Sequence, residues 1–305
     1  MSKTLGQLRV MLAKTPSGAG VDSVLLDGYI NSRLREIIER NDWLRLIKIG
    51  TIQTIAPYET GTVALTNGVN TVTGTGTTFT SGMTGRRFRP EGRSEFYTFT
   101  YVSATSGTLD RVYEGDDVTG ASFKIFKNIY AMPSDLDRIE SLKVPRTNRD
   151  LDQVGREYLD ERDPAREWYG AAEAYALADD SADSTPLVQI ELFPIPDRAE
   201  GLPIRYRVAV AELAAAATKI PEWVNPYAII YGVEADLYNL MEKPGMAQAK
   251  ESKFEQIISG MLRQDAIQTE VEALQMNSRY TRHRAQRAGF DGDSDFAEFY
   301  YQQGE

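Results

Sequence analysis

Few residues in this chain could act as catalytic groups, and none of them stands in a recognisable catalytic pattern. The sequence contains no cysteine and a single histidine, His283. The lack of cysteine excludes disulfides, thiolate nucleophiles and cysteine-ligated zinc. A Ser-His-Asp triad would have to use His283, which lies among arginines in a segment that we expect to be flexible, where a general base is poorly positioned. We therefore expect no catalytic residues and no enzymatic activity.

Two short patterns could suggest phosphate or calcium binding, but each lacks an essential residue. The threonine- and glycine-rich run 73–78 has no Walker lysine and no helical pattern after it, so we expect a tight β-turn. Aspartates alternate over 291–295 as they do at the start of an EF-hand loop. The sixth position is Phe296 instead of glycine, and the twelfth is Gln302 instead of glutamate. We expect no metal site and no cofactor.

Carboxylates and tyrosines leave a carbohydrate-related function open. The chain has 44 acidic residues, so adjacent pairs such as Asp160 and Glu161 are expected on solvated surfaces. Nothing selects two of them as the acid and nucleophile of a glycosidase. A sugar ring could be contacted by Tyr97, Tyr101 and Tyr113, although strand propensity and core packing explain these residues equally well.

The overall composition narrows the class of protein. The chain has 305 residues, of which 42% are hydrophobic, and a net charge of −10, which argues against coating nucleic acid by charge neutralisation. Its first 14 residues have no continuous apolar core, and no apolar run approaches the roughly 20 residues that span a bilayer. We expect a protein that folds in the cytoplasm and does not associate with membranes.

Apolar residues recur at helical spacing near both ends of the chain. Thr4 can cap a short first helix, and Asp22 or Ser23 can cap a longer one that ends near Trp43, a residue expected to anchor the core. Four charged residues off the apolar stripe of the longer helix are expected in solvent; they are Arg33, Arg35, Glu36 and Arg40.

The stretch 225–276 predicts an antiparallel helical hairpin. Asn225 can cap its first helix, and Pro226 fits the first turn. Lys243-Pro244-Gly245 interrupts the pattern, and a second helix is expected from near Met246. The apolar stripe of that helix comprises Phe254, Ile257, Ile258, Met261 and Leu262, and it continues weakly through Ile267, Val271 and Leu274.

The middle of the chain is rich in strand signals. Turn-forming pairs divide 60–127 into short strands, which favours a small antiparallel β-barrel or sandwich inserted between helical halves. A charged segment that starts near 153 and includes 163–168 is predicted to be mostly helical. The stretches 187–193 and 203–210 predict an antiparallel strand pair, because residues of the second alternate between apolar and polar.

These elements predict an α+β fold. Its helical core comes from the N- and C-terminal helices, and it carries an inserted antiparallel β-barrel or sandwich, a second short antiparallel sheet and an extended C-terminal tail. We expect N-terminal helices and a first strand over 1–56, and the β insert over 57–130. Strands and the helical hairpin are expected over 131–278, and a partner-binding tail over 279–305.

The C-terminal tail has the composition of a segment that becomes ordered on a partner. It is strongly charged and contains aromatics that cannot readily form a core of their own. Arginine and aromatic residues are enriched at the centres of protein interfaces. The residues that we expect to contact a partner are Arg279, Arg282, Arg284, Arg287, Phe290, Phe296, Phe299, Tyr300 and Tyr301.

Several motifs in order along the chain resemble those of head-to-tail adaptor proteins of tailed bacteriophages. The run 25–31, LLDGYIN, leads into Asn41-Asp42-Trp43, and 132–139, MPSDLDRI, is similar to an LPxDxxxI segment of phage neck proteins. Asn225-Pro226-Tyr227, followed by 229–235, is similar to their late helix. The stretch 71–88 resembles a β module that recurs in phage structural proteins. Together the motifs extend over most of the chain.

This resemblance implies a structural protein of the virion neck, assembled in the host cytoplasm. Such adaptors form a homo-oligomeric ring, as a rule a dodecamer, below the portal protein. Their C-terminal segments dock on the portal, and a tail terminator, stopper or nozzle protein binds underneath. DNA passes through the lumen without specific binding. The alternative function is a tail or baseplate protein whose β insert binds a host surface glycan.

Overall fold

A computed structural model describes residues 2–178 and 188–287, and the side chains of these residues as far as 267. The described chain is an α+β protein that forms two compact units. Met1–Leu46 with Val210–Glu305 form the helical unit, and Ile47–Ala209 form the strand unit. This division groups 131–209 with the β insert, whereas the predicted segments grouped these residues with the C-terminal helices. Over the described ranges, no helix combines the length and the apolarity needed to cross a membrane.

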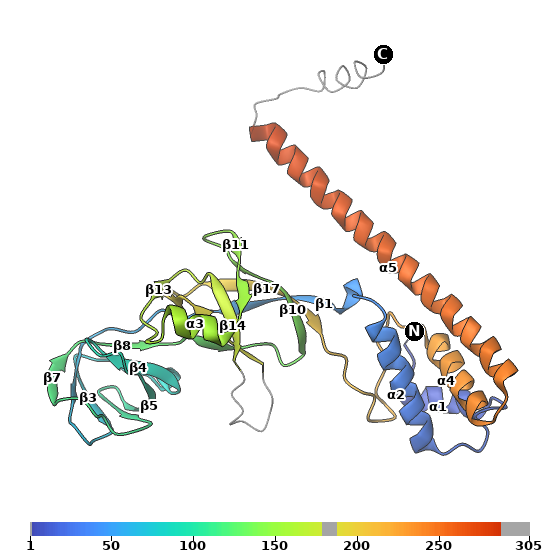
Figure 1. Ribbon diagram of the computed structural model, residues 1–305, viewed down its shortest axis with the longest axis horizontal. Coiled ribbons are helices and arrows are strands. Elements are labelled where there is room, and N and C mark those ends of the chain that lie inside the picture. The colour runs from blue at the N-terminus through green and yellow to red at the C-terminus, as the bar shows by residue number, and fades with distance from the viewer. Residues whose placement is uncertain (1, 179–187, 288–305) are drawn as a thin grey trace, which may run out of the picture. The chain divides into compact units, whose positions relative to one another are not determined.

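The helices of the helical unit begin where capping residues satisfy their first N–H groups (Figure 1). Thr4 accepts a hydrogen bond from the backbone N–H of Gln7, Asp22 from that of Val24, and Asn225 from that of Tyr227. These N–H groups have no acceptor within their own helix. The predicted caps are therefore confirmed for α1 (Leu5–Ala13), α2 (Ser23–Glu39) and α4 (Pro226–Leu240).

Side chains from α1, α2, α4 and α5 (Pro244–Arg287) form one apolar core. Leu8 of α1, Ile30 of α2, Val233 of α4 and Phe254 of α5 are fully buried within it. Trp43 is also buried there, and its ring centroid lies 4.9 Å from that of Trp223. The expectation that Trp43 anchors the core is confirmed.

The last helix, α5, is a single helix that continues past the ends of α1, α2 and α4 in Figure 1. It begins at Pro244, two residues before the predicted start, after Glu242 adopts a φ of 54°. Its 44 residues correspond to about 66 Å at about 1.5 Å per residue. Ile267 is 60% exposed, so the core-facing stripe ends before it. Residues 279–287, predicted to be extended, are helical.

Two four-stranded sheets of the strand unit pack around a shared apolar cluster. The first has the order β1-β17-β10-β11, with bounds Ile47–Gln53, Gly201–Val208, Leu136–Val144 and Arg149–Asp150. The second has the order β12-β14-β15-β9, with bounds Asp152–Val154, Ala174–Ala178, Gln189–Phe193 and Ile129–Ala131. In β17 buried and exposed residues alternate as predicted, because one face of the strand covers the cluster.

The predicted pairing of 187–193 with 203–210 is wrong. β15 pairs with β14 and β9, whereas β17 pairs with β1 and β10. The connection between them is not a hairpin turn, because within it β16 (Ile195–Pro196) pairs with β13 (Tyr169–Gly170). β15 is buried on both faces at 190–193, which is typical of a strand inside a sheet, not of one half of an isolated pair.

The segment that starts near 153 and includes 163–168, predicted to be mostly helical, is helical only in part. The helix in this region, α3 (Arg156–Arg162), ends before Asp163, whose φ is −149° and ψ 70°. Asp163 precedes Pro164, and the proline ring disfavours helical torsions in the residue before it. The Asp163 carboxylate then accepts hydrogen bonds from the backbone N–H groups of Glu167 and Trp168, at 2.8 and 2.9 Å, which fixes a turn.

The β insert is a seven-stranded antiparallel sheet that curls into a nearly closed barrel (Figure 1). At its two ends lie β7 (Val118–Ala121) and β8 (Phe123–Phe126), which are consecutive in sequence and separated by Ser122 alone. A one-residue link between opposite edges requires the sheet to curl. The strands between them are β2, β3, β6, β5 and β4, over Thr62–Leu65, Thr71–Thr75, Ser106–Leu109, Tyr97–Ser103 and Arg86–Pro90.

Aromatic side chains fill the barrel. Phe88, Phe99 and Phe123 are fully buried and lie in contact, with the Phe88 ring 6.1 Å from Phe99 and 5.7 Å from Phe123. Tyr97 and Tyr113 are each 1% exposed within the same cluster. Core packing therefore accounts for two of the three tyrosines that could have contacted a sugar.

We expect Gly107→Ala to destabilise the barrel by about 1–3 kcal/mol, the usual cost of overpacking a core. A Cβ atom at Gly107 would lie 2.1 Å from the ring of Phe99, which is itself fully buried. Denaturant titration of the full chain, combined with hydrogen exchange of barrel peptides, measures the loss. Gly82→Ala is the matched control, because its Cβ would meet no atom closer than 4.0 Å. Equal effects of the two substitutions would contradict the packing argument.

Candidate functional site

The predicted partner-binding residues fall partly inside and partly outside the described chain. Arg279, Arg282, Arg284 and Arg287 belong to α5, but their side chains lie beyond those described. Outside the described residues altogether are Phe290, Phe296, Phe299, Tyr300 and Tyr301. The structure therefore describes in full how α5 is held at its base, where this helix joins α2 and α4.

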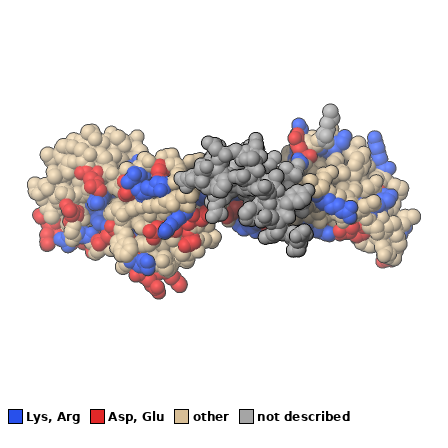
Figure 2. Space-filling view, turned by 90° about the horizontal axis from the view of Figure 1, so that it is seen from above, with Lys and Arg blue, Asp and Glu red and all other residues tan. Residues whose placement is uncertain are grey.

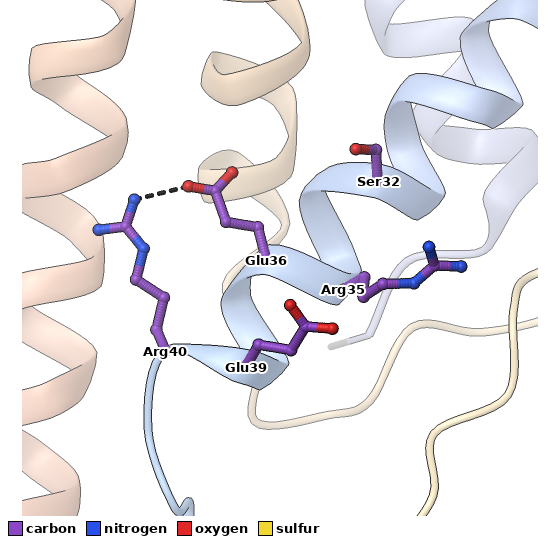
Figure 3. Close-up of a pocket in the computed structure, with 5 residues that line it drawn as sticks. All are labelled: Ser32, Arg35, Glu36, Glu39 and Arg40. Carbon is purple, nitrogen blue, oxygen red and sulfur yellow. Dashed lines mark hydrogen bonds and ion pairs between the residues drawn. The ribbon is translucent and has the colours of Figure 1, made fainter.

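A charged hollow of about 480 Å³ opens on the C-terminal half of α2 (Figure 3). In Figure 3 the side chains of Glu36 and Arg40 point toward each other, and they are joined by an ion pair of 2.6 Å between residues four apart. Arg35 and Glu39 point to another side of the helix. All five lining residues come from one stretch of chain: Ser32, Arg35, Glu36, Glu39 and Arg40.

Arg33, next to this hollow, joins three helices through its guanidinium group. Its Nε and Nη2 donate to the two carboxylate oxygens of Asp236 on α4, at 2.8 and 2.6 Å. Its Nη1 and Nη2 donate to the carboxylate of Glu251 on α5, at 3.1 and 3.0 Å. Nη1 also donates to Glu36, at 2.9 Å. Two bidentate pairs on one guanidinium fix its position closely, because the planar fork matches carboxylate geometry.

Two arginines of the α2 segment lie close to the ring of Phe254 of α5. The guanidinium carbon of Arg33 lies 5.1 Å from the ring centroid, and that of Arg40 lies 5.5 Å from it. Arg40 also forms an ion pair of 2.7 Å with Glu255, the next residue along α5. Phe254 itself is fully buried in the apolar core. Cation–π contacts therefore reinforce the packing of α5 against α2.

The carboxylates at this junction keep both arginines charged. Burial opposes the charge of Arg33, but the hydrogen bonds that Arg33 donates to Asp236 and Glu251 outweigh it and raise its pKa above the usual value. Hydrogen bonds to Glu255 and Glu36 raise the pKa of Arg40 in the same way. The ion pairs therefore persist over the whole range of pH in which the carboxylates are ionised.

Three carboxylates at this junction stand close enough to ligate a cation. One oxygen from each of Glu36, Glu251 and Glu255 lies within 4.8 Å of the others. Each of the three carboxylates is already paired with Arg33 or Arg40. Half-buried carboxylates whose charge is already compensated by arginines are better suited to joining helices than to ligating a metal.

Further polar contacts hold α5 on either side of this junction in the sequence, at Lys250 and at Asp265. Lys250 donates to the buried carboxylate of Glu234 on α4, at 2.7 Å. Asp265, which is 6% exposed, accepts hydrogen bonds from the backbone N–H of Leu44 and from Nδ2 of Asn41, at 3.2 and 3.1 Å. We call this set of contacts, from Lys250 to Asp265 on α5, the α5 anchor.

The expectation that the charged residues of α2 lie in solvent is wrong for Arg33, whose side chain is 11% exposed. It is right for Arg35, which is 62% exposed. The signal that could have distinguished them is spacing. Arg33, Glu36 and Arg40 follow one another at intervals of three and four, so they share a face of the helix. That face borders the apolar stripe and lies against α4 and α5.

The strand unit contains a second charged cluster, centred on the buried carboxylate of Glu191 in β15. Arg166 donates from Nε to one of its oxygens at 2.6 Å, and Asn128 donates to the same oxygen at 2.9 Å. Arg166 also donates to the backbone carbonyls of Asp163 and Leu159, at 2.6 and 3.2 Å. These bonds join α3 and the following turn to the sheet, so we assign the cluster a structural role.

Comparison with known proteins gives no family assignment, because no protein-family model matches the chain and no curated protein matches its sequence.

Proposed function

We propose that this protein is an architectural adaptor of a tailed-bacteriophage neck, with no enzymatic activity. In this proposal, helices from both ends of the chain form one wedge, and copies of the wedge close a ring between the portal and the next neck component. The observation that supports it best is the α5 anchor. It fixes the base of a 44-residue helix to α2 and α4 and thereby makes the helix a stiff arm leading into the arginine- and aromatic-rich segment.

The C-terminal segment is the portal-docking element in this proposal. Arginines from 279 to 287 pair with acidic groups of the portal, and the aromatics from 290 to 301 fill apolar pockets. A helix rooted in a packed core carries residues 279–287 at a defined distance from that core, which lowers the entropy lost on docking. Support also comes from composition, since arginine and aromatic side chains dominate interface hot spots.

The charge of the chain is compatible with a channel that does not retain DNA. The net charge is −10, and carboxylates repel phosphates. On the visible surface of each unit in Figure 2, lysine and arginine side chains are interspersed with aspartate and glutamate. Passage without specific binding requires such a surface, because each neutralised phosphate adds salt-dependent affinity.

We expect a chain that ends at Met276 to fold normally but to lose attachment to portal rings. The α5 anchor lies N-terminal to the cut, so the circular dichroism and the unfolding midpoint should stay close to those of the full chain. Attachment is measured by mixing the protein with purified portal rings and imaging the product by electron microscopy.

The truncation removes the arginines and also shortens α5, so a full-length variant is needed to separate the two effects. Arg282→Ala, Arg284→Ala and Arg287→Ala together remove the basic group and keep alanine, which favours helix. Arg263→Ala is the control on the exposed part of the same helix. We expect the triple variant to lose most ring attachment and the control to keep it. Normal attachment of the chain ending at Met276 would show that the docking role is wrong.

A further inference from the structure

A basic pocket of about 390 Å³ lies in the strand unit, where β4 and β5 of the barrel approach β9 and β15. Three of its lining residues are cationic, and none is acidic. Its lining comprises Gly85, Arg86, Arg87, Thr98, Lys127, Asn128, Ile129, Ala131 and Gln189. The chain as a whole has a net charge of −10, so this pocket is a local excess of positive charge.

Within the described part of the chain, the cations of this pocket have no carboxylate partner. Arg87 donates to the hydroxyl of Thr98 at 3.2 Å and lies over the ring of Phe96, at 4.9 Å from its centroid. Lys127 lies 5.1 Å from the ring centroid of Tyr130. The carboxylate joined to the pocket through Asn128 is Glu191, and it is already engaged by Arg166.

The pocket disfavours its own positive charges. Burial lowers the pKa of Arg86, and burial together with the charge of Arg86 lowers the pKa of Lys127. Tyr130, beside them, does not supply a negative charge, because burial raises its pKa to about 12 and keeps the hydroxyl neutral. Two like charges that are held together and partly shielded from water are stabilised when an anion enters between them.

The donors fit an oxygen-rich anion. The planar fork of Arg86 can bind two oxygens of one group, and Lys127 adds a point charge. Gly85 adopts a φ of 82°, and a Cβ atom there would meet nothing within 4 Å, so the backbone beside Arg86 is accessible. A pocket of 300–1,000 Å³ is the usual size for a small-molecule site, so this volume accommodates more than a bare ion.

We propose that this pocket binds a phosphate group, either as inorganic phosphate or as the phosphomonoester of a small molecule, with Arg86 and Lys127 as its principal contacts. A small dianion is favoured over nucleic acid, because a polyanion would also meet the repulsion of the net negative chain. The proposal does not depend on the neck function proposed above.

The test is isothermal titration calorimetry of the full chain in phosphate-free buffer at constant ionic strength, with inorganic phosphate and with adenosine monophosphate as probes. We expect the wild-type chain to bind at least one of them. Arg86→Gln and Lys127→Gln should each raise the Kd at least tenfold. Tighter binding of the monophosphate indicates a phosphorylated small molecule, and equal or weaker binding indicates the free ion.

Lys124→Gln is the matched control, because it removes one positive charge from β8 while leaving the pocket intact. Lys124 pairs with Glu59 at 3.0 Å and does not line the pocket. Its Kd should stay within twofold of the wild-type value. Without ligand, Arg86→Gln and Lys127→Gln should unfold no earlier than the wild-type chain, since each relieves repulsion. No binding of either probe at millimolar concentration, an equal loss in the control, or tighter binding of a DNA duplex than of both probes would overturn the proposal.

Discussion

Replacing Arg166 with methionine is expected to destabilise the strand unit by about 3–5 kcal/mol, the usual cost of removing one partner of a buried ion pair. The side chains of Arg166 and Glu191 are 10% and 3% exposed, and they are joined at 2.6 Å. Without the guanidinium, Glu191 would keep Asn128 as a hydrogen-bond donor, together with a distant ion pair of 3.7 Å to Arg156. The carbonyls of Leu159 and Asp163 would also lose a donor.

Denaturant titration of the full chain, combined with hydrogen exchange of peptides from α3 and β15, measures this loss. Arg162→Met is the matched control, because Arg162 is exposed at the end of α3 and contacts only the ring of Tyr158 among the described interactions. Adding Glu191→Gln to Arg166→Met should recover part of the stability, since a neutral amide costs less to bury than a carboxylate. A loss below about 1 kcal/mol for Arg166→Met would contradict the assignment of this pair as a buried structural contact.

Replacing Arg33 with methionine is expected to destabilise the helical unit by about 3 kcal/mol, the lower end of the range for buried pairs. Arg33 neutralises Glu36, Asp236 and Glu251, whose side chains are 33%, 23% and 37% exposed. Water can therefore reach these carboxylates and offset part of their repulsion. The substitution also removes one of the two cations that face Phe254.

Fluorescence of the paired Trp43 and Trp223 rings follows the unfolding of this unit, because both belong to it. The control is Arg35→Met on the same helix, whose pair with Glu212 is exposed and should contribute less than about 1 kcal/mol. Arg33→Lys should lose nearly as much stability as Arg33→Met, because an ammonium cannot form two bidentate pairs. Equal effects of Arg33→Met and Arg35→Met would contradict the proposed α5 anchor.

Local signals in the sequence were sufficient to predict where the capped helices begin and where most strands of the barrel end. Thr4, Asp22 and Asn225 act within three residues of their own position, so the sequence alone predicts their role. Turn-forming pairs such as Asn67-Gly68 similarly mark strand ends. By contrast, β14 spans Ala174–Ala178, where alanine favours helix, and it is a strand because it pairs with β12 and β15.

The contacts that define the candidate site could not be predicted in this way. Arg33 and Asp236 are more than 200 residues apart in sequence, and each by itself has the properties of an ordinary surface residue. Likewise, Arg86 lies at the start of β4 and Lys127 directly after β8, and only folding reveals that they share a pocket without a carboxylate. The sequence predicts the types of these residues, whereas the tertiary structure determines their neighbours.

Two segments of the chain that are far apart in sequence form the helical unit, so they are synthesised at different times. α1 and α2 leave the ribosome first, but the helix that covers their apolar faces, α4, begins only at Pro226. At about 5–20 residues per second, translation of the intervening strand unit, Ile47–Ala209, takes about 8–33 seconds. During that time the leucine and isoleucine side chains of α1 and α2 lack the helix that covers them in the folded unit, which leaves apolar surface of the kind that chaperones bind until the last quarter of the chain emerges.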